Sequence, residues 1–261
     1  MDRIADHNRK AWDAMGEKGS PWAKAVSSDE VARARAGDLA IVLTPVKRVP
    51  ADWLGDVRGR DVLCLASGGG QQAPLLAAAG ARVTSWDNSP QQLALDRHVA
   101  EREGLALETR QGDMRDLSGL DDGSIDLIVQ PVATCFVPDV RAVWRECARV
   151  LRPGGRLLTG VINPVFFIFD PDLSDGEGRL VVRHPLPYRE DAPETMAPGR
   201  RAEVAAGDPM EFSHSLTDLI QGQIAAGLTL RDLYEDGWED ASPQPLNAYL
   251  PTFLATLAQK A

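Results

Sequence analysis

The chain has 261 residues, which is long enough for one α/β domain with an elaboration, and a formal charge of −10 at pH 7. This acidity works against a nucleic-acid or anionic-membrane partner, and the polar residues 1–10, with no long apolar stretch after them, predict a soluble protein without a signal peptide or membrane anchor. The three cysteines, Cys64, Cys135 and Cys147, lack metal-ligand spacing and predict reduced thiols of a cytoplasmic protein, with neither a disulfide nor a metal site.

Residues 1–54 precede the first predicted strand, and we expect them to form an N-terminal helical cap segment. Apolar residues over 29–47 recur at helical spacing, interrupted by a glycine and a proline. The segment also carries Trp12 and Trp22 near turn-forming residues. Such a segment can cover a pocket; the alternative is that both tryptophans only pack the N-terminal helices onto the domain.

The stretch 61–73 reads Asp-Val-Leu-Cys-Leu-Ala-Ser-Gly-Gly-Gly-Gln-Gln-Ala and predicts a buried strand, a tight turn and a helix. This pattern is typical of the first βα unit of a doubly wound sheet. Three consecutive glycines remove every Cβ from the turn, so a ligand can lie against the backbone and meet the N–H groups of the helix N-terminus. The alternative is a sharp turn that binds nothing.

A second predicted strand, 81–86, ends at Asp87, about twenty residues beyond the glycine turn, as in a doubly wound nucleotide site. That spacing places a carboxylate where it can accept hydrogen bonds from both ribose hydroxyls of a nucleoside. Ser89 and Pro90 are the predicted N-cap and first residue of the next helix, and Gly104 is its predicted end.

A third predicted strand, 105–110, leads to Gly112-Asp113-Met114. An acid at this position can take the exocyclic amine of an adenine while Met114 lies on the ring, although a solvated loop acid is the alternative. Residues 125–129 form an apolar fourth strand. A helix over 140–151 is then expected to stop at Arg-Pro-Gly-Gly, 152–155, before a fifth strand over 156–162.

These ordered motifs together resemble the class I S-adenosylmethionine-dependent methyltransferases of the small-molecule type. The resemblance is clear over about 61–162 and rests on Leu63 to Gly70, Asp87, Gly112 to Met114 and Arg149 to Gly155. It implies a doubly wound, seven-stranded Rossmann-like sheet, mostly parallel with the last strand antiparallel, and helices on both faces. It also implies a methyltransferase domain over 55–261, with a lid insertion at 163–214 after strand five.

The resemblance further implies S-adenosyl-L-methionine as the cofactor. The residues expected to bind it come from the cap and from the ends of the first four strands: Trp22, Ala66, Ser67, Gly68, Gly70, Gln71, Asp87, Asn88, Gln92, Gly112, Asp113, Met114, Gln130 and Pro131. Two positions depart from the family pattern. Cys64 stands where an acidic residue is usual, and Ala66 stands where a glycine is usual, so the methionine end of the cofactor is expected to be held differently.

The C-terminal part follows the same family pattern. A helix over 215–226, a sixth strand over 228–235 and an antiparallel seventh strand over 251–260 are expected. The segment 163–214 is rich in proline, glycine and charge, and a loop of that length in a compact domain is usually a lid or a functional insertion. Alternating residues over 179–188 predict a strand within it.

A sulfonium methyl group is already electrophilic, so the protein has to align a nucleophile and exclude water. A hydroxyl acceptor would benefit from a general base, for which His184, His214, Glu211 and Tyr188 are candidates, each with a structural role as the alternative. We predict that three of these line the acceptor site as catalytic groups: His184, His214 and Tyr188. Three further residues are predicted to bind the substrate: Trp12, Cys135 and Phe136.

The predicted activity is methyl transfer to an oxygen, nitrogen or carbon atom of a small molecule by a monomer or homodimer. Nucleic-acid methylation is not expected, because Gln130 to Ala133 lacks an Asn/Asp-Pro-Pro-aromatic clamp for a flipped base. An NAD(P)-dependent oxidoreductase is an alternative, since Gly68-x-Gly70-x-x-Ala73 with Asp87 also satisfies the dinucleotide fingerprint. A non-catalytic S-adenosylmethionine-binding regulatory module is a second alternative.

Overall fold

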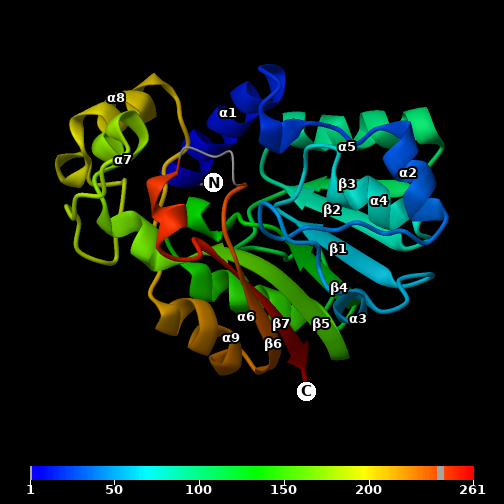
Figure 1. Ribbon diagram of the computed structural model, residues 1–261. Coiled ribbons are helices and arrows are strands. Elements are labelled where there is room, and N and C mark those ends of the chain that lie inside the picture. The colour runs from blue at the N-terminus through cyan, green and yellow to red at the C-terminus, as the bar shows by residue number, and fades with distance from the viewer. Residues whose placement is uncertain (1, 240–243) are drawn as a thin grey trace.

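A computed structural model describes residues 2–239 and 244–261 of the chain, which form a twisted seven-stranded sheet with helices on both faces (Figure 1). The strand order is β3-β2-β1-β4-β5-β7-β6. The strands are β1 (Asp61–Leu65), β2 (Arg82–Asp87), β3 (Leu107–Gln111), β4 (Ile125–Gln130), β5 (Leu151–Ile162), β6 (Leu228–Asp236) and β7 (Phe253–Lys260). The first five pair in parallel, and β7 lies antiparallel between β5 and β6, which confirms the predicted sheet.

Helices α2, α4 and α5 cover one face of the sheet, and α6 and α9 cover the other (Figure 1). The helices are α1 (Arg3–Glu17), α2 (Ser28–Arg35), α3 (Ala51–Leu54), α4 (Gln72–Ala78), α5 (Pro90–Glu103), α6 (Val140–Val150), α7 (Pro171–Glu177), α8 (Pro198–Ala206) and α9 (Gly222–Ala225). Among the described residues, no helix has both the length and the apolar character needed to cross a membrane.

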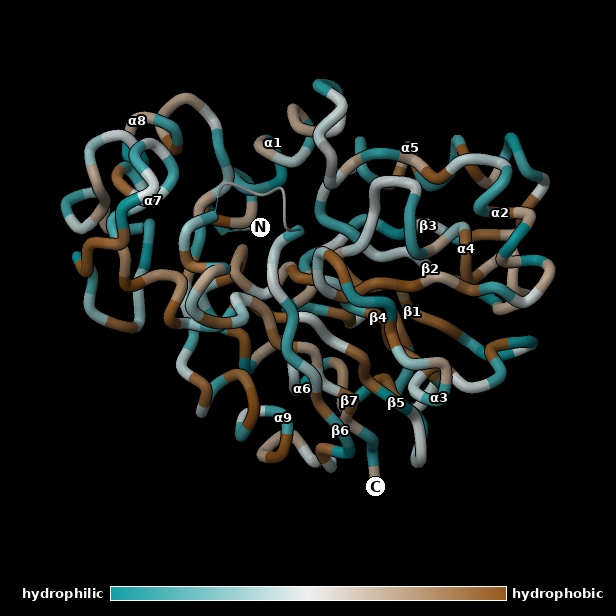
Figure 2. The backbone as a smooth tube through the Cα atoms, viewed as in Figure 1, coloured by the Kyte–Doolittle hydropathy of each residue, from teal (hydrophilic) through white to brown (hydrophobic). Residues whose placement is uncertain are grey.

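The central strands are buried on both faces, as their continuous apolar runs predict. Each face has its own apolar cluster, one containing the fully buried Trp53 and the other the fully buried Trp144. Figure 2 shows the same pattern as hydrophobic stretches in the strands at the centre of the molecule, with hydrophilic residues frequent on the surrounding helices. The sheet is therefore held by two separate cores, and its carboxyl edge is left for loops to cover.

Local signals fixed the ends of α5 as predicted. The Ser89 side chain accepts a hydrogen bond from the Gln92 N–H, and Pro90 is the first helical residue. Gly104 ends the helix in the left-handed conformation at φ 63°. The Ser89 side chain satisfies a free N–H of the first turn, and the ring of Pro90 presets a helical φ. Gly104 can adopt the left-handed φ that ends the helix.

Three expected elements differ from the structure. Residues 179–188 form no strand, because prolines at 185 and 187 cannot donate to a ladder, and only Val182 makes an isolated bridge, to Phe169. The helix expected over 29–47 was predicted to break near Gly37 and Pro45; it does end before Gly37, which has a φ of 98°, but only its first part, α2, is helical. Strand β5 begins directly after α6, at Leu151, which is earlier than expected. The predicted turn at 152–155 is present as an irregularity within the strand, because the pairing with β4 passes from Ile125–Leu151 to Leu127–Arg156 and Gly154 has a φ of 78°.

The helix expected over 215–226 is present in altered form. It contains a wider π-helical turn over Thr217–Gln221, which leads into α9. Strand β6 follows at Leu228, as expected.

The insertion 163–214 contains α7 and α8 and lies beside α1, away from the main sheet (Figure 1). Asn8 of α1 connects three segments, because its Nδ2 donates to the carbonyls of Phe136 (2.9 Å) and Met210 (3.0 Å) and its Oδ1 accepts from the Met210 N–H (2.7 Å). Asn8 is only 4% exposed, so these bonds are shielded from water. The N-terminal helix is thereby fixed against both the loop after β4 and the end of the insertion.

Gly160 of β5 is predicted to be intolerant of a side chain. A Cβ there would collide with the Leu43 carbonyl, which accepts a hydrogen bond from the Val132 N–H. We expect Gly160→Ala to lower the free energy of unfolding by about 1–3 kcal/mol, because the loop through Leu43 must move away. Urea denaturation measures this change.

The matched control is Gly176→Ala in α7, where an added Cβ meets nothing within 4 Å. That change should leave stability unchanged or raise it by up to about 1 kcal/mol. Equal effects of the two substitutions would contradict the close contact between Leu43 and β5.

Candidate functional site

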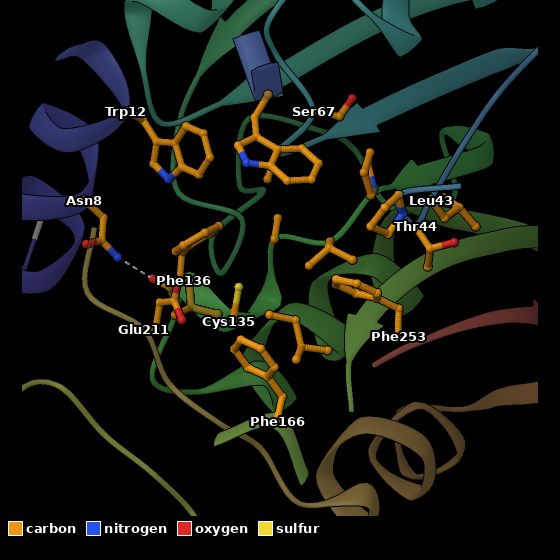
Figure 3. Close-up of a pocket in the computed structure, with 18 of the residues that line it drawn as sticks. Asn8, Trp12, Leu43, Thr44, Ser67, Cys135, Phe136, Phe166, Glu211 and Phe253 are labelled. Carbon is orange, nitrogen blue, oxygen red and sulfur yellow. Dashed lines mark hydrogen bonds between the residues drawn. The ribbon is translucent and has the colours of Figure 1, made fainter. Parts of the chain in front are cut away.

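A large pocket of about 1590 Å³ lies at the carboxyl edge of the sheet, between α1, the 163–214 insertion and the loops that follow β1 to β5 (Figure 3). Single drug-sized ligands occupy pockets of about 300–1,000 Å³. Ser67, next to the glycine turn, and Glu211, at the end of the insertion, lie on opposite sides of this pocket in Figure 3. The space is sufficient for two ligands bound side by side.

The glycine turn after β1 is held by two carboxylates. The Gly68 N–H donates to Asp87 Oδ2 (3.1 Å), and the Gly70 N–H donates to Asp96 Oδ1 (2.7 Å). The N–H of the glycine between them donates to a main-chain carbonyl of α5. The protein itself therefore uses the N–H groups of all three glycines, and the expectation that a ligand meets the N–H groups of the helix N-terminus stays a prediction.

Asp96 is a residue that the sequence analysis missed. It is 0% exposed, and its second oxygen accepts a hydrogen bond from Ser85 Oγ (2.6 Å). Burial raises the pKa of Asp96 to about 7, although both hydrogen bonds favour the charged form. The available signal was an acidic residue at helical spacing between the buried Leu93 and Val99 of α5.

Asp87 ends β2 and faces the pocket. Its oxygens accept the N–H groups of Gly68 and Ser89 (2.9 Å), and no arginine or lysine in the described part of the chain pairs with it. Burial raises the pKa of Asp87 to about 6, against the effect of these hydrogen bonds. An uncompensated carboxylate with remaining lone pairs is suited to hydroxyl donors.

Ala66 adopts a conformation that explains why a glycine is usual at its position. Its φ is +47°, in the left-handed region, where an L-residue costs about 1–2 kcal/mol. The preceding strand residue Cys64 is fully buried, and burial raises the pKa of its thiol, so it stays protonated away from the pocket.

Asp113 lines the pocket but is already paired. Arg115 donates from its Nε and Nη2 to both Asp113 oxygens, the latter at 2.6 Å, and its own N–H also donates to Oδ1 (2.9 Å). The Arg115 guanidinium also bonds Asp2 (2.7 Å), at the start of α1. This cation was missed, and it competes with any amine that Asp113 would receive.

Gln130 supports the pocket from behind and does not line it. Its Nε2 donates to the Met114 sulfur (3.4 Å), and its Oε1 accepts from Thr159 Oγ1 (3.0 Å). Gln130 is 0% exposed, whereas Met114 and Pro131 border the cavity. Its observed contacts fix the position of Met114.

Several polar atoms around the glycine turn have no hydrogen-bond partner among the described residues. They are Ser67 Oγ, Asn88 Oδ1 and Gln92 Oε1, all from residues that border the pocket. These three oxygens are enclosed by protein atoms, whereas the uncompensated Asp87 is half-buried and borders the pocket. This end of the pocket fits a nucleoside with hydroxyl and amine donors.

The opposite end of the pocket is aromatic. Trp12 meets Phe136 edge-on with ring centroids 5.1 Å apart, and Phe167 stacks on Tyr188 at 5.9 Å. His184 packs against Tyr188 at 4.7 Å, and burial lowers its pKa, so its ring is neutral at pH 7. These rings and the nearby Cys135 provide an apolar lobe.

His214 and Tyr188 are both engaged in internal contacts. His214 does not line the large pocket; its Nε2 lies 3.0 Å from the Thr134 carbonyl, behind Cys135. The Tyr188 hydroxyl donates to Glu190 Oε1 (2.9 Å), and burial raises the pKa of Tyr188 strongly. The structure therefore brings His184 and Tyr188 into the acceptor lobe but leaves His214 out of it.

Glu211 borders the aromatic lobe beside Asn8, Cys135 and Phe136 (Figure 3). Its main chain is paired with Glu190, but no described residue donates a hydrogen bond to its carboxylate. Burial, which the Arg200 charge only partly offsets, raises the pKa of Glu211 to about 7. Sequence reasoning considered Glu211 but did not select it.

The structure gathers most of the predicted site residues around one cavity. Those that line it are Trp12, Trp22, Ala66, Ser67, Gly68, Gln71, Asp87, Asn88, Gln92, Gly112, Asp113, Met114, Pro131, Cys135, Phe136, His184 and Tyr188. Three do not: Gly70, Gln130 and His214. The individual roles of these residues remain predictions.

Comparison with known proteins decides the family. A model described as a methyltransferase domain matches residues 63–159, which include the glycine turn, Asp87 and Asp113. The protein named Uncharacterized methyltransferase YbaJ, of Bacillus subtilis (strain 168), is 45% identical over 262 residues, spanning 100% of both chains. The chain belongs to the class I S-adenosylmethionine-dependent methyltransferases. Its activity is methyl transfer and its cofactor is S-adenosylmethionine, which excludes the predicted NAD(P) alternative.

Further similarities of this methyltransferase are more distant. The Ubiquinone biosynthesis O-methyltransferase of Xanthomonas oryzae pv. oryzae is 32% identical over 121 residues, 46% of this chain and 51% of the relative. Among solved structures, an S-adenosylmethionine-dependent methyltransferase from Mesorhizobium loti has a TM-score of 0.61 at 20% identity, covering 80% of this chain and 94% of the other. A Burkholderia thailandensis 1,6-didemethyltoxoflavin-N1-methyltransferase has a TM-score of 0.58 at 16% identity, covering 99% and 89%. The two structural likenesses support the fold.

Asp87 and Asp113 should contribute unequally to cofactor binding. Asp87→Ala removes an uncompensated acceptor for two hydroxyls and should weaken S-adenosylmethionine binding by about 1.5–3 kcal/mol. Asp113→Ala should cost less than about 1.4 kcal/mol, a factor of ten, because Arg115 already occupies that carboxylate. Titration calorimetry of both variants tests this order, and a larger loss in the Asp113 variant would contradict it.

Cofactor affinity should also depend on the ionisation of Asp87. Hydroxyl donors favour the carboxylate, and the Asp87 pKa of about 6 means that this group becomes protonated below about pH 6 and must lose that proton before binding is strong. Between pH 6.5 and pH 5 we expect the Kd for S-adenosylhomocysteine to rise roughly five- to tenfold. The same titration on Asp87→Asn should be nearly flat, and an unchanged slope in that variant would assign the dependence to another group.

Proposed function

We propose that this methyltransferase acts on a small molecule with a flat aromatic body, which binds in the lobe between α1 and the 163–214 insertion. The observation that carries the proposal is the continuity of one pocket of about 1590 Å³, with Asp87 at one end and stacked aromatic rings at the other. A flat ring fits between Phe136 and the insertion because edge and face contacts with aromatic side chains are favourable.

The cofactor end of the pocket would be formed by the predicted cofactor-binding residues that line it. Asp87 would accept the ribose hydroxyls, Met114 would lie against the adenine, and Ser67 and Gln92 would border the methionine part. S-adenosylmethionine supplies an electrophilic methyl group when bound. The protein's contribution is then to hold the acceptor atom in line with that group and to keep water out.

The N-terminal segment 1–54 and the insertion 163–214 would act as covering segments of the 55–261 methyltransferase domain. Asn8 ties α1 to the insertion at Met210, and the Asn88 Nδ2 donates to the Ala5 carbonyl (2.8 Å), which fixes α1 over the end of β2. A pocket roofed in this way favours a small acceptor over a macromolecule, because a polymer needs an open groove. The formal charge of −10 also disfavours a nucleic-acid acceptor.

Labelled methyl transfer tests the proposal. The protein is incubated with methyl-labelled S-adenosylmethionine and a protein-free, nucleic-acid-free metabolite extract, and the products are separated and identified by mass spectrometry. We expect label in an aromatic small molecule, and loss of that signal in Asp87→Ala. Label found only when protein or nucleic acid is added, with none in the metabolite fractions, would contradict a small-molecule acceptor.

A further inference from the structure

Glu211 borders the aromatic lobe, and its carboxylate receives no hydrogen bond from the described residues. Glu211 is held by its main chain, since its N–H donates to Glu190 Oε2 (2.8 Å) and its carbonyl accepts the Glu190 N–H (3.2 Å). Both bonds fix the backbone, and the side chain borders the pocket beside Cys135 and Phe136 (Figure 3).

Arg200, whose charge acts on Glu211, donates no hydrogen bond to the Glu211 carboxylate. Arg200 donates from Nε and Nη2 to the two oxygens of Glu190 (2.8 and 2.9 Å), from Nη2 to the Pro209 carbonyl (2.6 Å) and from Nη1 to Glu203 (3.3 Å). Glu190 also receives the Tyr188 hydroxyl. Glu190 is therefore fully satisfied, whereas the carboxylate of Glu211 receives no hydrogen bond from any described residue.

The surroundings of Glu211 combine this unsatisfied acceptor with apolar rings. The same pocket is lined by Trp12 and Phe136, whose rings meet edge-on, and by the contacting rings of Phe166, Phe167 and Tyr188. The aromatic walls suit a ring, and the carboxylate suits a proton donor on that ring. A neutral amine needs no base before it attacks, whereas a hydroxyl gains nucleophilicity as its proton is withdrawn.

We propose that Glu211 is the general base of the reaction and that the acceptor is an aromatic hydroxyl, such as a phenol or an enol. As the methyl group is transferred, the bond between oxygen and carbon forms and the bond between sulfur and carbon breaks, its electron pair remaining on sulfur. The hydroxyl proton passes to the Glu211 carboxylate and afterwards to solvent. This inference rests on the proposed small-molecule function and deepens it.

Other charged groups around Glu211 support the assignment. Glu190, Asp175 and Asp208 repel its negative charge, and Arg200 attracts it. Burial has the largest effect, and together these influences raise the pKa of Glu211 to about 7, the range in which a base is most effective at neutral pH. His184 is the competing candidate, but its Nε2 is enclosed by protein atoms and has no partner there.

The test starts from the methylated product of the metabolite extract. Mass spectrometry and acid hydrolysis distinguish an aryl O-methyl group from N-, S- or C-methyl groups. An aryl ether is expected; methylation of another atom overturns the hydroxyl assignment while leaving the small-molecule function intact. No methylated metabolite at all overturns the proposed function itself.

Kinetics of Glu211→Gln then test the base. We expect kcat to fall by roughly a hundredfold or more, with KM changed less than about threefold. In the wild type, a plot of log kcat/KM against pH should rise and level off near pH 7. This rising part of the plot, called the acid limb below, should be absent in Glu211→Gln. Compared with Glu211→Gln, Glu211→Asp should recover part of the rate and should show the acid limb again. A Glu211→Gln variant with near-normal kcat, or with a raised KM alone, shows a binding role and overturns the proposal.

Two controls separate this effect from misfolding. Glu177→Gln makes the same charge change at an exposed carboxylate of the insertion, paired with Arg179 at 2.8 Å, and should keep normal turnover and pH profile. Binding of S-adenosylhomocysteine, measured by calorimetry, should be equal in wild type and Glu211→Gln. If that affinity falls as well, Glu211 acts on the structure of the pocket, and the assignment as base is wrong.

Discussion

The structure depends on the hydrogen bonds that two carboxylates accept from the glycine turn after β1. Asp87, at the end of β2, accepts a hydrogen bond from the Gly68 N–H. Asp96, in α5, accepts one from the Gly70 N–H. Burial works against both charges and raises both pKa values, while the main-chain donors stabilise the ionised forms. Since no cation in the described chain pairs with either, the turn and the two acids are stable only together.

This arrangement determines what the turn can offer a ligand. The N–H groups of its three glycines are committed to the protein, which leaves the free lone pairs of Asp87 and the side chains of neighbouring residues for a ligand. Ser89 Oγ donates to Asp13 (2.7 Å), and the Val26 N–H donates to the Gly70 carbonyl (2.8 Å). The N-terminal segment is thus attached directly to the turn that it covers.

Charge in the pocket follows a simple distribution. Arg115 is committed to Asp113 and Asp2, and Arg200 is committed to Glu190. Asp87 at one end and Glu211 at the aromatic end are among the pocket acids that pair with no cation in the described part of the chain. Each acid faces the cavity and has a raised pKa, so the two ends are matched to ligands that donate protons or hydrogen bonds.

The sequence predicts those features that depend on short stretches of chain. The strand and turn at 61–70, the capping of α5 by Ser89 and Pro90, and its end at Gly104 follow from local apolar runs and backbone preferences. The absent strand at 179–188 shows the limit, because alternation without a partner strand does not fix an extended ladder.

The parts of the site that were not predicted depend on contacts between distant segments. Asn8 meets Met210 across almost the whole chain, and whether Arg200 neutralises Glu190 or Glu211 is decided by tertiary packing. His184 and His214 are equivalent in sequence as isolated histidines, yet only His184 reaches the pocket. Residue type identified the possible groups, and the fold selected among them.

The central claim is that one pocket binds the cofactor at Asp87 and leaves the aromatic end for the acceptor. A crystal structure of the protein with S-adenosylhomocysteine tests it most directly. The account predicts ribose hydroxyls within hydrogen-bond distance of both Asp87 oxygens and open space between the homocysteine sulfur and the Glu211 carboxylate. A ligand that lies in the aromatic lobe against Glu211, or that makes no contact with Asp87, would contradict it.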